Sequence, residues 1–104
     1  MNLEKKGSEI KNMQAKGEKF FWLDVRLPQE KKIADLGGDL IPVHILEQNH
    51  QSLPKNIPII CYCHHGVRSL AAAEILRSKG FEAYSLAGGI DQWSLDIDPK
   101  ITRY

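Results

Sequence analysis

Hydrophobic residues along the chain fall into short runs separated by polar stretches. The run FFWLDV, residues 20–25, has the length and the aromatic and β-branched content of a strand. The run IPIICY, residues 57–62, is continuously apolar after a proline, which is typical of a strand buried on both faces of a parallel sheet. Shorter strands are predicted for EAYSL, residues 82–86, and for LIPVHIL, residues 40–46, which Pro42 interrupts.

The segments between these runs carry helix signals. SLAAAEILRSK, residues 69–79, is rich in alanine, has apolar residues at helical spacing and precedes Gly80, a common helix end. A shorter helix is predicted to begin at Ser8 and to end at Gly17. Strands that alternate with helices indicate an α/β fold with a mostly parallel sheet. Further helical turns are expected in residues 28–36, in the polar segment 47–56 before Pro54, and around Trp93, ahead of an irregular tail at residues 96–104.

Length and charge narrow the class of protein. The 104 residues suit one small domain, 1–104, and no repeat or linker divides them. A net charge of +1 indicates neither a nucleic-acid surface nor a polybasic membrane anchor. The N-terminal residues lack an apolar signal segment, and no apolar run reaches the roughly 18 residues of a membrane span. Two cysteines in such a chain indicate a reducing compartment, so a cytoplasmic location is expected.

The candidate chemistry lies in IICYCHHGVRS, residues 59–69, which holds both cysteines. Cys63 follows the buried strand, so it lies at the carboxyl ends of the strands, where α/β proteins bind ligands. The following helix offers free N–H groups and the positive end of its dipole. A loop from Cys63 to Ser69 is therefore expected to surround one anion with amides.

These features make Cys63 the candidate nucleophile, because a helix N-terminus favours the reactive thiolate. Arg68 offers a forked donor for an anionic substrate, and Gly66 permits a tight backbone turn. His64 and His65 add N–H donors, and positive charge when protonated.

Two other readings of the same residues are weaker. A disulfide between Cys61 and Cys63 would close a small, strained ring. A zinc site from these cysteines with His64 and His65 lacks the usual ligand spacing, so no metal is expected. Cys61 is interpreted as a buried core residue, with a second sulfur-carrying or resolving thiol as the alternative.

Three motifs resemble one family. CYCHHGVRS, residues 61–69, resembles the active-site loop of rhodanese-type sulfurtransferases. DVRLPQE, residues 24–30, resembles the N-terminal signature of that family, and LAGGIDQW, residues 86–93, its C-terminal one. Because the three occur in the family's order, the resemblance covers about residues 8–94, the expected core of the domain.

The resemblance implies a rhodanese-like fold, a five-stranded parallel sheet flanked by helices on both sides. It implies that Cys63 takes a sulfane sulfur from thiosulfate or a persulfide donor and passes it to cyanide, a thiol or a sulfur-relay protein, without a cofactor. For Asp24 and Arg26, a structural role such as an ion pair is the open alternative. The residues implied to bind substrate are His64, His65, Gly66, Val67, Arg68 and Arg26.

Loop length separates the nearest relatives of this family. Four residues lie between Cys63 and Arg68, whereas the related dual-specificity phosphatases and arsenate reductases carry one more. The shorter loop favours sulfur transfer. A small phosphatase or arsenate reductase and a non-catalytic binding module of the same fold remain the alternatives.

Overall fold

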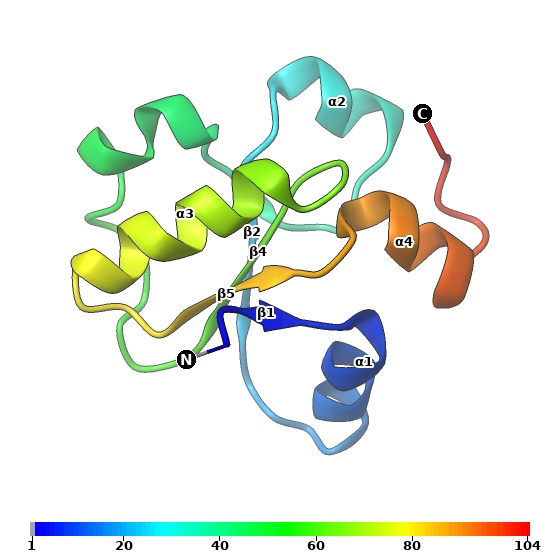
Figure 1. The fold of residues 1–104 in the computed structure, drawn as a ribbon, viewed down its shortest axis with the longest axis horizontal. Helices are drawn as coiled ribbons and strands as arrows, with labels where there is room; N and C mark the ends of the chain where they lie inside the picture. Colours follow the sequence, from blue (N-terminus) through cyan, green and yellow to red (C-terminus); the bar gives the residue numbers. More distant parts are fainter. Residues whose placement is uncertain (1) are drawn as a thin grey trace.

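The computed structural model describes residues 2–104 and contains one sheet of five parallel strands in the order β1-β5-β4-β2-β3 (Figure 1). The strands are β1 (Glu4–Lys5), β2 (Phe21–Asp24), β3 (Asp39–Leu40), β4 (Ile59–Tyr62) and β5 (Ala83–Leu86). The helices are α1 (Gly7–Ala15), α2 (Pro28–Ile33), α3 (Val67–Ser78) and α4 (Gly89–Asp96), with a 3-10 helix η1 (Val43–Gln48). The predicted α/β class and five-stranded parallel sheet are confirmed.

The central strand β4 is buried on both faces, as its continuous apolar run predicts. Side chains alternate between the faces of a strand. Cys61 therefore belongs to the core cluster that α3 and η1 cover, together with Ile59 and Cys63. Ile60 and Tyr62 belong to the opposite cluster, which α1 and α4 cover. Helices thus lie on both sides of the sheet, and Cys63 continues the strand into the first core.

The predicted strand at residues 40–46 is wrong beyond Leu40. Ile41 and Val43 still donate their N–H groups to the carbonyls of Asp24 and Val25, at 2.9 and 3.1 Å. Pro42 between them has no N–H to donate, and the chain turns into η1 directly after it. The helix expected between residue 47 and Pro54 is also wrong, because η1 ends at Gln48 and turns follow.

Strand β1 is absent from the prediction. The carbonyls of Leu3 and Lys5 accept hydrogen bonds from Ser85 and Ala87 at 2.7 and 2.8 Å, which adds β1 to the edge of β5. Its two residues, Glu4 and Lys5, are charged and show no apolar pattern. Only pairing with β5 makes this segment a strand.

The C-terminal tail contains no helix or strand after α4, but it is attached to the domain. Ile101 and Tyr104 pack against the second core cluster, and Ser94 donates a hydrogen bond to the carbonyl of Ile101 at 2.6 Å. The tail ends near α2, beside the loop that follows β4 (Figure 1). Within residues 2–104, no helix has both the length and the apolar character needed to cross a membrane.

Candidate functional site

The loop after β4 turns sharply into α3. Cys63 directly follows the strand, and α3 begins at Val67, two residues earlier than predicted. Gly66 makes the turn with a φ of 102°, a conformation that side chains other than glycine rarely adopt. The loop is therefore as short as the spacing between Cys63 and Arg68 indicates.

The Cys63 sulfur lies at the centre of this turn. The amides of Gly66 and Ser69 donate hydrogen bonds to Sγ at 3.1 and 3.3 Å, and the side chain is 1% exposed. The amides of Val67 and Arg68 belong to the first turn of α3, where N–H groups have no partner within the helix. The arrangement places N–H dipoles around one sulfur atom, which suits a thiolate or another anion.

Ser69, at which the predicted helix began, lies inside α3. Its buried hydroxyl accepts a hydrogen bond from the Cys63 thiol at 3.4 Å and contacts the hydroxyl of Ser85 at 2.7 Å. Sequence reasoning missed Ser85, whose position near the end of the buried strand β5 was the available signal. The Ser69 hydroxyl thus links the Cys63 sulfur to Ser85 through two consecutive hydrogen bonds.

The start of α4 fixes the loop from the other side. The amides of Ile90 and Asp91 donate to the carbonyls of Cys63 and His64 at 2.9 and 3.1 Å. A Cβ on Gly89 would lie 2.6 Å from the Cys63 carbonyl oxygen, and Gly89 also has a φ of 66°. Gly89 of the LAGG segment is therefore required by the close approach of two backbones.

Gly89→Ala is expected to destabilise the protein by about 2–4 kcal/mol, combining left-handed strain with backbone overlap. The overlap also moves the Cys63 carbonyl, so we expect sulfur chemistry at Cys63 to slow by at least about tenfold. Urea unfolding and the rate of Cys63 modification measure the two effects. Gly17→Ala is the matched control, because Gly17 has a φ of 71° and nothing within 4 Å of an added Cβ. Equal losses in the two variants would contradict the role of the backbone overlap.

Arg68 is paired with a carboxylate. Its guanidinium donates to both oxygens of Glu30, at 2.6 and 2.8 Å. The Tyr104 hydroxyl donates to the same carboxylate at 2.8 Å. The hydrogen bonds from Arg68, despite opposing burial, lower the pKa of Glu30 to about 2. The same hydrogen bonds raise the pKa of Arg68.

The Glu30 pKa predicts acid sensitivity. Because the folded pKa of about 2 lies below the ordinary value of 4.5, the ion pair contributes its full stability above about pH 4.5. That contribution is lost as the pH falls from 4.5 towards 2. We therefore expect the melting temperature of the wild type to exceed that of Glu30→Gln at neutral pH, with the gap closing across this range. A gap that stays constant with pH would contradict the assignment.

The guanidinium of Arg26 is hydrogen-bonded to groups of the protein itself. Arg26 is fully buried, and its guanidinium donates to both oxygens of Asp24 at 2.8 Å and to the Ala34 carbonyl at 2.7 Å. It also donates to the Tyr104 hydroxyl at 2.9 Å. Burial acts to lower the pKa of Arg26, but the hydrogen bonds to Asp24 and Tyr104 raise it overall. These contacts favour the structural alternative for Asp24 and Arg26, in which neither side chain binds substrate.

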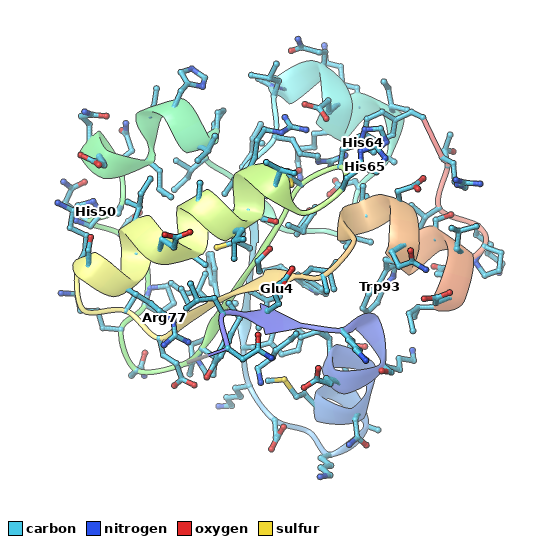
Figure 2. All side chains as sticks on the ribbon, in the orientation of Figure 1. Glu4, His50, His64, His65, Arg77 and Trp93 are labelled. Carbon is cyan, nitrogen blue, oxygen red and sulfur yellow. The ribbon has the colours of Figure 1, made fainter. Side chains whose placement is uncertain are left out.

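His64 and His65 lie between the loop and the C-terminal tail (Figure 2). The His64 ring stacks on Tyr104 with a centroid distance of 3.8 Å and an interplanar angle of 9°. The two histidine rings also stack, at 3.8 Å and 25°. His64 Nε2 is buried without a hydrogen-bond partner among the described residues. Tyr104 therefore holds the first side chain after Cys63 as well as the Glu30–Arg68 pair.

A metal would be poorly held beside these rings. His64, His65 and Asp91 have candidate ligand atoms within 4.8 Å of one another. The two imidazoles are stacked, however, so their nitrogen lone pairs lie in nearly parallel planes and do not converge on one ion. Arg103 also occupies the Asp91 carboxylate, at 2.9 and 3.3 Å.

The two cysteines differ in what they can do. Both are free thiols. Cys61 is completely buried in the first core, and burial raises the pKa of its thiol, which favours its interpretation as a core residue. Only Cys63 lies in the amide-lined turn.

Comparisons with known proteins agree with this arrangement. The family model described as Rhodanese-like domain matches residues 7–96. The tRNA sulfurtransferase of Desulfurococcus amylolyticus is 37% identical over 76 residues, covering 73% of this chain and 15% of that protein. The probable adenylyltransferase/sulfurtransferase MoeZ of Mycobacterium tuberculosis is 32% identical over 100 residues, covering 92% of this chain and 26% of that protein. The chain thus spans only 15% to 26% of the length of these two relatives.

A solved structure has the same fold over its full length. The crystal structure of a rhodanese-like domain protein from Staphylococcus aureus gives a TM-score of 0.83 with 27% sequence identity. The match covers 100% of this chain and 99% of that one. The predicted rhodanese-like fold is therefore confirmed.

Proposed function

The chain belongs to the rhodanese-like domain family, and on this premise we propose that it is a sulfurtransferase that carries sulfur on Cys63. It takes a sulfane sulfur from thiosulfate or a persulfide donor and passes it to cyanide or another thiophilic acceptor. The supporting observation is the Cys63 sulfur, which receives the amides of Gly66 and Ser69 at 3.1 and 3.3 Å in a buried turn. Relatives whose names include sulfur transfer support the same reaction class.

The reaction has two balanced steps. The Cys63 thiolate attacks the outer sulfur of the donor, a new S–S bond forms, and the donor's own S–S bond breaks. The leaving group, sulfite or a thiolate, departs with that electron pair. The terminal sulfur of the Cys63 persulfide is an anion, so the amides that face Cys63 stabilise it. The acceptor then attacks this terminal sulfur and restores the Cys63 thiolate, without a metal or cofactor.

Phosphoryl or arsenate chemistry is less well supported. The loop has only four residues, His64 to Val67, between Cys63 and Arg68. Arg68 is also held by Glu30 on two hydrogen bonds, so it would have to leave a carboxylate to bind an oxyanion. A non-catalytic module would not require the amides of Gly66 and Ser69 to point at a cysteine sulfur.

The chemistry of the transferred sulfur also indicates which molecules can accept it and in which compartment the protein acts. The transferable atom is a sulfur held as an anion, so suitable acceptors are cyanide, small thiols or the cysteine of a sulfur-relay protein. Free cysteines persist in a reducing compartment. We accordingly propose a cytoplasmic setting, with neither a nucleic acid nor a membrane as partner.

Intact-mass spectrometry tests the proposal directly. The protein is incubated with thiosulfate or with an alkyl persulfide, and peptide mapping then locates any added sulfur. We expect a gain of one sulfur atom on Cys63, reversed by cyanide with formation of thiocyanate. No gain from either donor, or turnover of a phosphate ester or arsenate instead, would overturn the assignment.

A further inference from the structure

In the described part of the chain, each arginine around the Cys63 loop, namely Arg26, Arg68 and Arg103, is paired with a carboxylate. Arg68 shares two short hydrogen bonds with Glu30, whose side chain is only 14% exposed. The buried Arg26 is neutralised by Asp24 in the same way. Nearby, Asp91 faces His65 at 3.9 Å and Arg103 at 2.9 Å. An anion that approaches the loop therefore meets amide dipoles and charge-balanced pairs instead of a free guanidinium.

The two proposed sulfur donors, thiosulfate and an alkyl persulfide, differ in net charge. Thiosulfate carries two negative charges and an alkyl persulfide carries one. The Cys63 thiolate adds one more negative charge. The thiolate and thiosulfate together therefore carry three negative charges, whereas the thiolate and a persulfide carry two. Like charges at close range repel strongly in a partly buried site. A cation that is already paired offsets that repulsion less than a free cation would.

We propose that Glu30 is a specificity-determining residue, which withholds Arg68 from anionic donors and tunes the site towards a cysteine persulfide over thiosulfate. This inference rests on the proposed sulfurtransferase function. The substrate class is the persulfide of a cysteine, either in a small thiol or in a peptide chain.

The Glu30 carboxylate is held in place by several donors. Besides Arg68, the Tyr104 hydroxyl donates to Oε2 at 2.8 Å, and the Leu27 amide donates to Oε1 at 3.2 Å. Tyr104 is itself fixed by the buried Arg26, which donates to its hydroxyl at 2.9 Å. Because four donors converge on one carboxylate, Glu30 cannot easily swing away when a donor enters. The Glu30–Arg68 ion pair is therefore fixed in place by the residues around it.

Arg68 lies in the turn that surrounds the reacting sulfur. It is the fifth residue after Cys63, in the first turn of α3, and directly precedes Ser69, whose amide donates to Sγ at 3.3 Å. If released from Glu30, its forked donors would be available to sulfonate oxygens of thiosulfate. An alkyl persulfide has no such oxygens, so it gains less from a free Arg68.

The step for the proposed donor is balanced. The Cys63 thiolate attacks the terminal sulfur of R–S–S⁻, and the S–S bond of the donor breaks. R–S⁻ leaves with the electron pair, and Cys63 becomes the persulfide. Two negative charges are present before and after the step, and no oxidant or reductant is required.

The test compares single-turnover loading of Cys63 by quenched mass spectrometry. The donors are thiosulfate, the persulfide of N-acetylcysteine methyl ester, and a short peptide with one persulfidated cysteine. In Glu30→Gln, which keeps an acceptor oxygen for the Leu27 amide, we expect the thiosulfate-to-persulfide rate ratio to rise about tenfold. Glu74→Gln is the matched control, because it removes the same charge from an exposed position further along α3. It should keep the wild-type ratio.

Each outcome decides the proposal. An unchanged ratio in Glu30→Gln, or a wild type that loads faster from thiosulfate than from the persulfides, overturns it while leaving sulfur transfer intact. Failure of every donor to load Cys63 would instead overturn the proposed function. If Glu30→Gln does not fold, Tyr104→Phe removes one donor from Glu30 and should raise the ratio less, in the same direction. Faster loading from the peptide than from the small ester identifies a peptide-borne source, and the reverse identifies a small thiol.

Discussion

Cys63→Ser is expected to lose sulfur loading and turnover completely, to at least about 10³-fold below the wild type. A serine hydroxyl is not ionised at neutral pH and does not form a stable bond to a transferable sulfur. The amides of Gly66 and Ser69, which donate to Sγ in the wild type, can donate to the serine oxygen instead. The fold should therefore remain intact, which separates the loss of chemistry from unfolding. Intact mass after donor treatment and the melting temperature give the two readouts.

Cys61→Ala is the matched control for this experiment. Cys61 also has a free thiol, but it is completely buried in the first core. We expect this variant to load one sulfur as the wild type does, with a stability loss of about 1 kcal/mol from the lost side-chain contacts. Loading that persists in Cys63→Ser or disappears in Cys61→Ala would exchange the roles of the two cysteines.

Arg26→Ala is expected to destabilise the protein by about 3–5 kcal/mol. The substitution leaves the Asp24 carboxylate fully buried without its cation. It also removes the hydrogen bonds that Arg26 donates to the Ala34 carbonyl and to the Tyr104 hydroxyl. Small domains have free energies of unfolding of about 5–15 kcal/mol, so this variant would lose a large part of its stability. Urea unfolding at neutral pH measures the effect.

Two further variants show whether the buried charge is the cause. Replacing both partners, Asp24→Leu with Arg26→Met, removes the stranded charge and should recover much of the loss. Arg103→Ala removes an arginine whose pairing with Asp91 is at the surface, and it should change unfolding only slightly. A loss in Arg26→Ala as small as that in Arg103→Ala would contradict the structural role of Arg26.

The parts of the fold that sequence patterns predict are those determined by local burial. The run at residues 57–62 predicts β4 because both of its faces are covered, and the alanine-rich segment predicts α3. Strand β1 could not be predicted, because its two charged residues become a strand only through pairing with β5. The segment after Pro42 has an apolar composition that suits a strand as well as η1, so its pattern was misleading.

The candidate site divides in the same way. The position of Cys63 and its turn follows from one continuous segment, and the structure agrees with it. The partners of Arg68 come from distant segments, since Glu30 is 38 residues away, and Tyr104 lies 74 residues from Glu30. A motif read along the chain identifies Arg68 as a free anion ligand, whereas the folded chain pairs it. Tyr104 carried no signal in the sequence, because nothing local distinguishes it from the rest of the irregular tail.

The hydrogen bonds that join Arg26, Tyr104, Glu30 and Arg68 also have a consequence for synthesis on the ribosome. Domains begin to fold during translation, from the N-terminal end. Cys63 and the sheet around it are made well before Tyr104. A nascent chain would thus present the nucleophile before the Glu30–Arg68 pair is fixed by Tyr104. The hydrogen bonds that hold the Glu30 carboxylate are completed only after Tyr104 has left the exit tunnel.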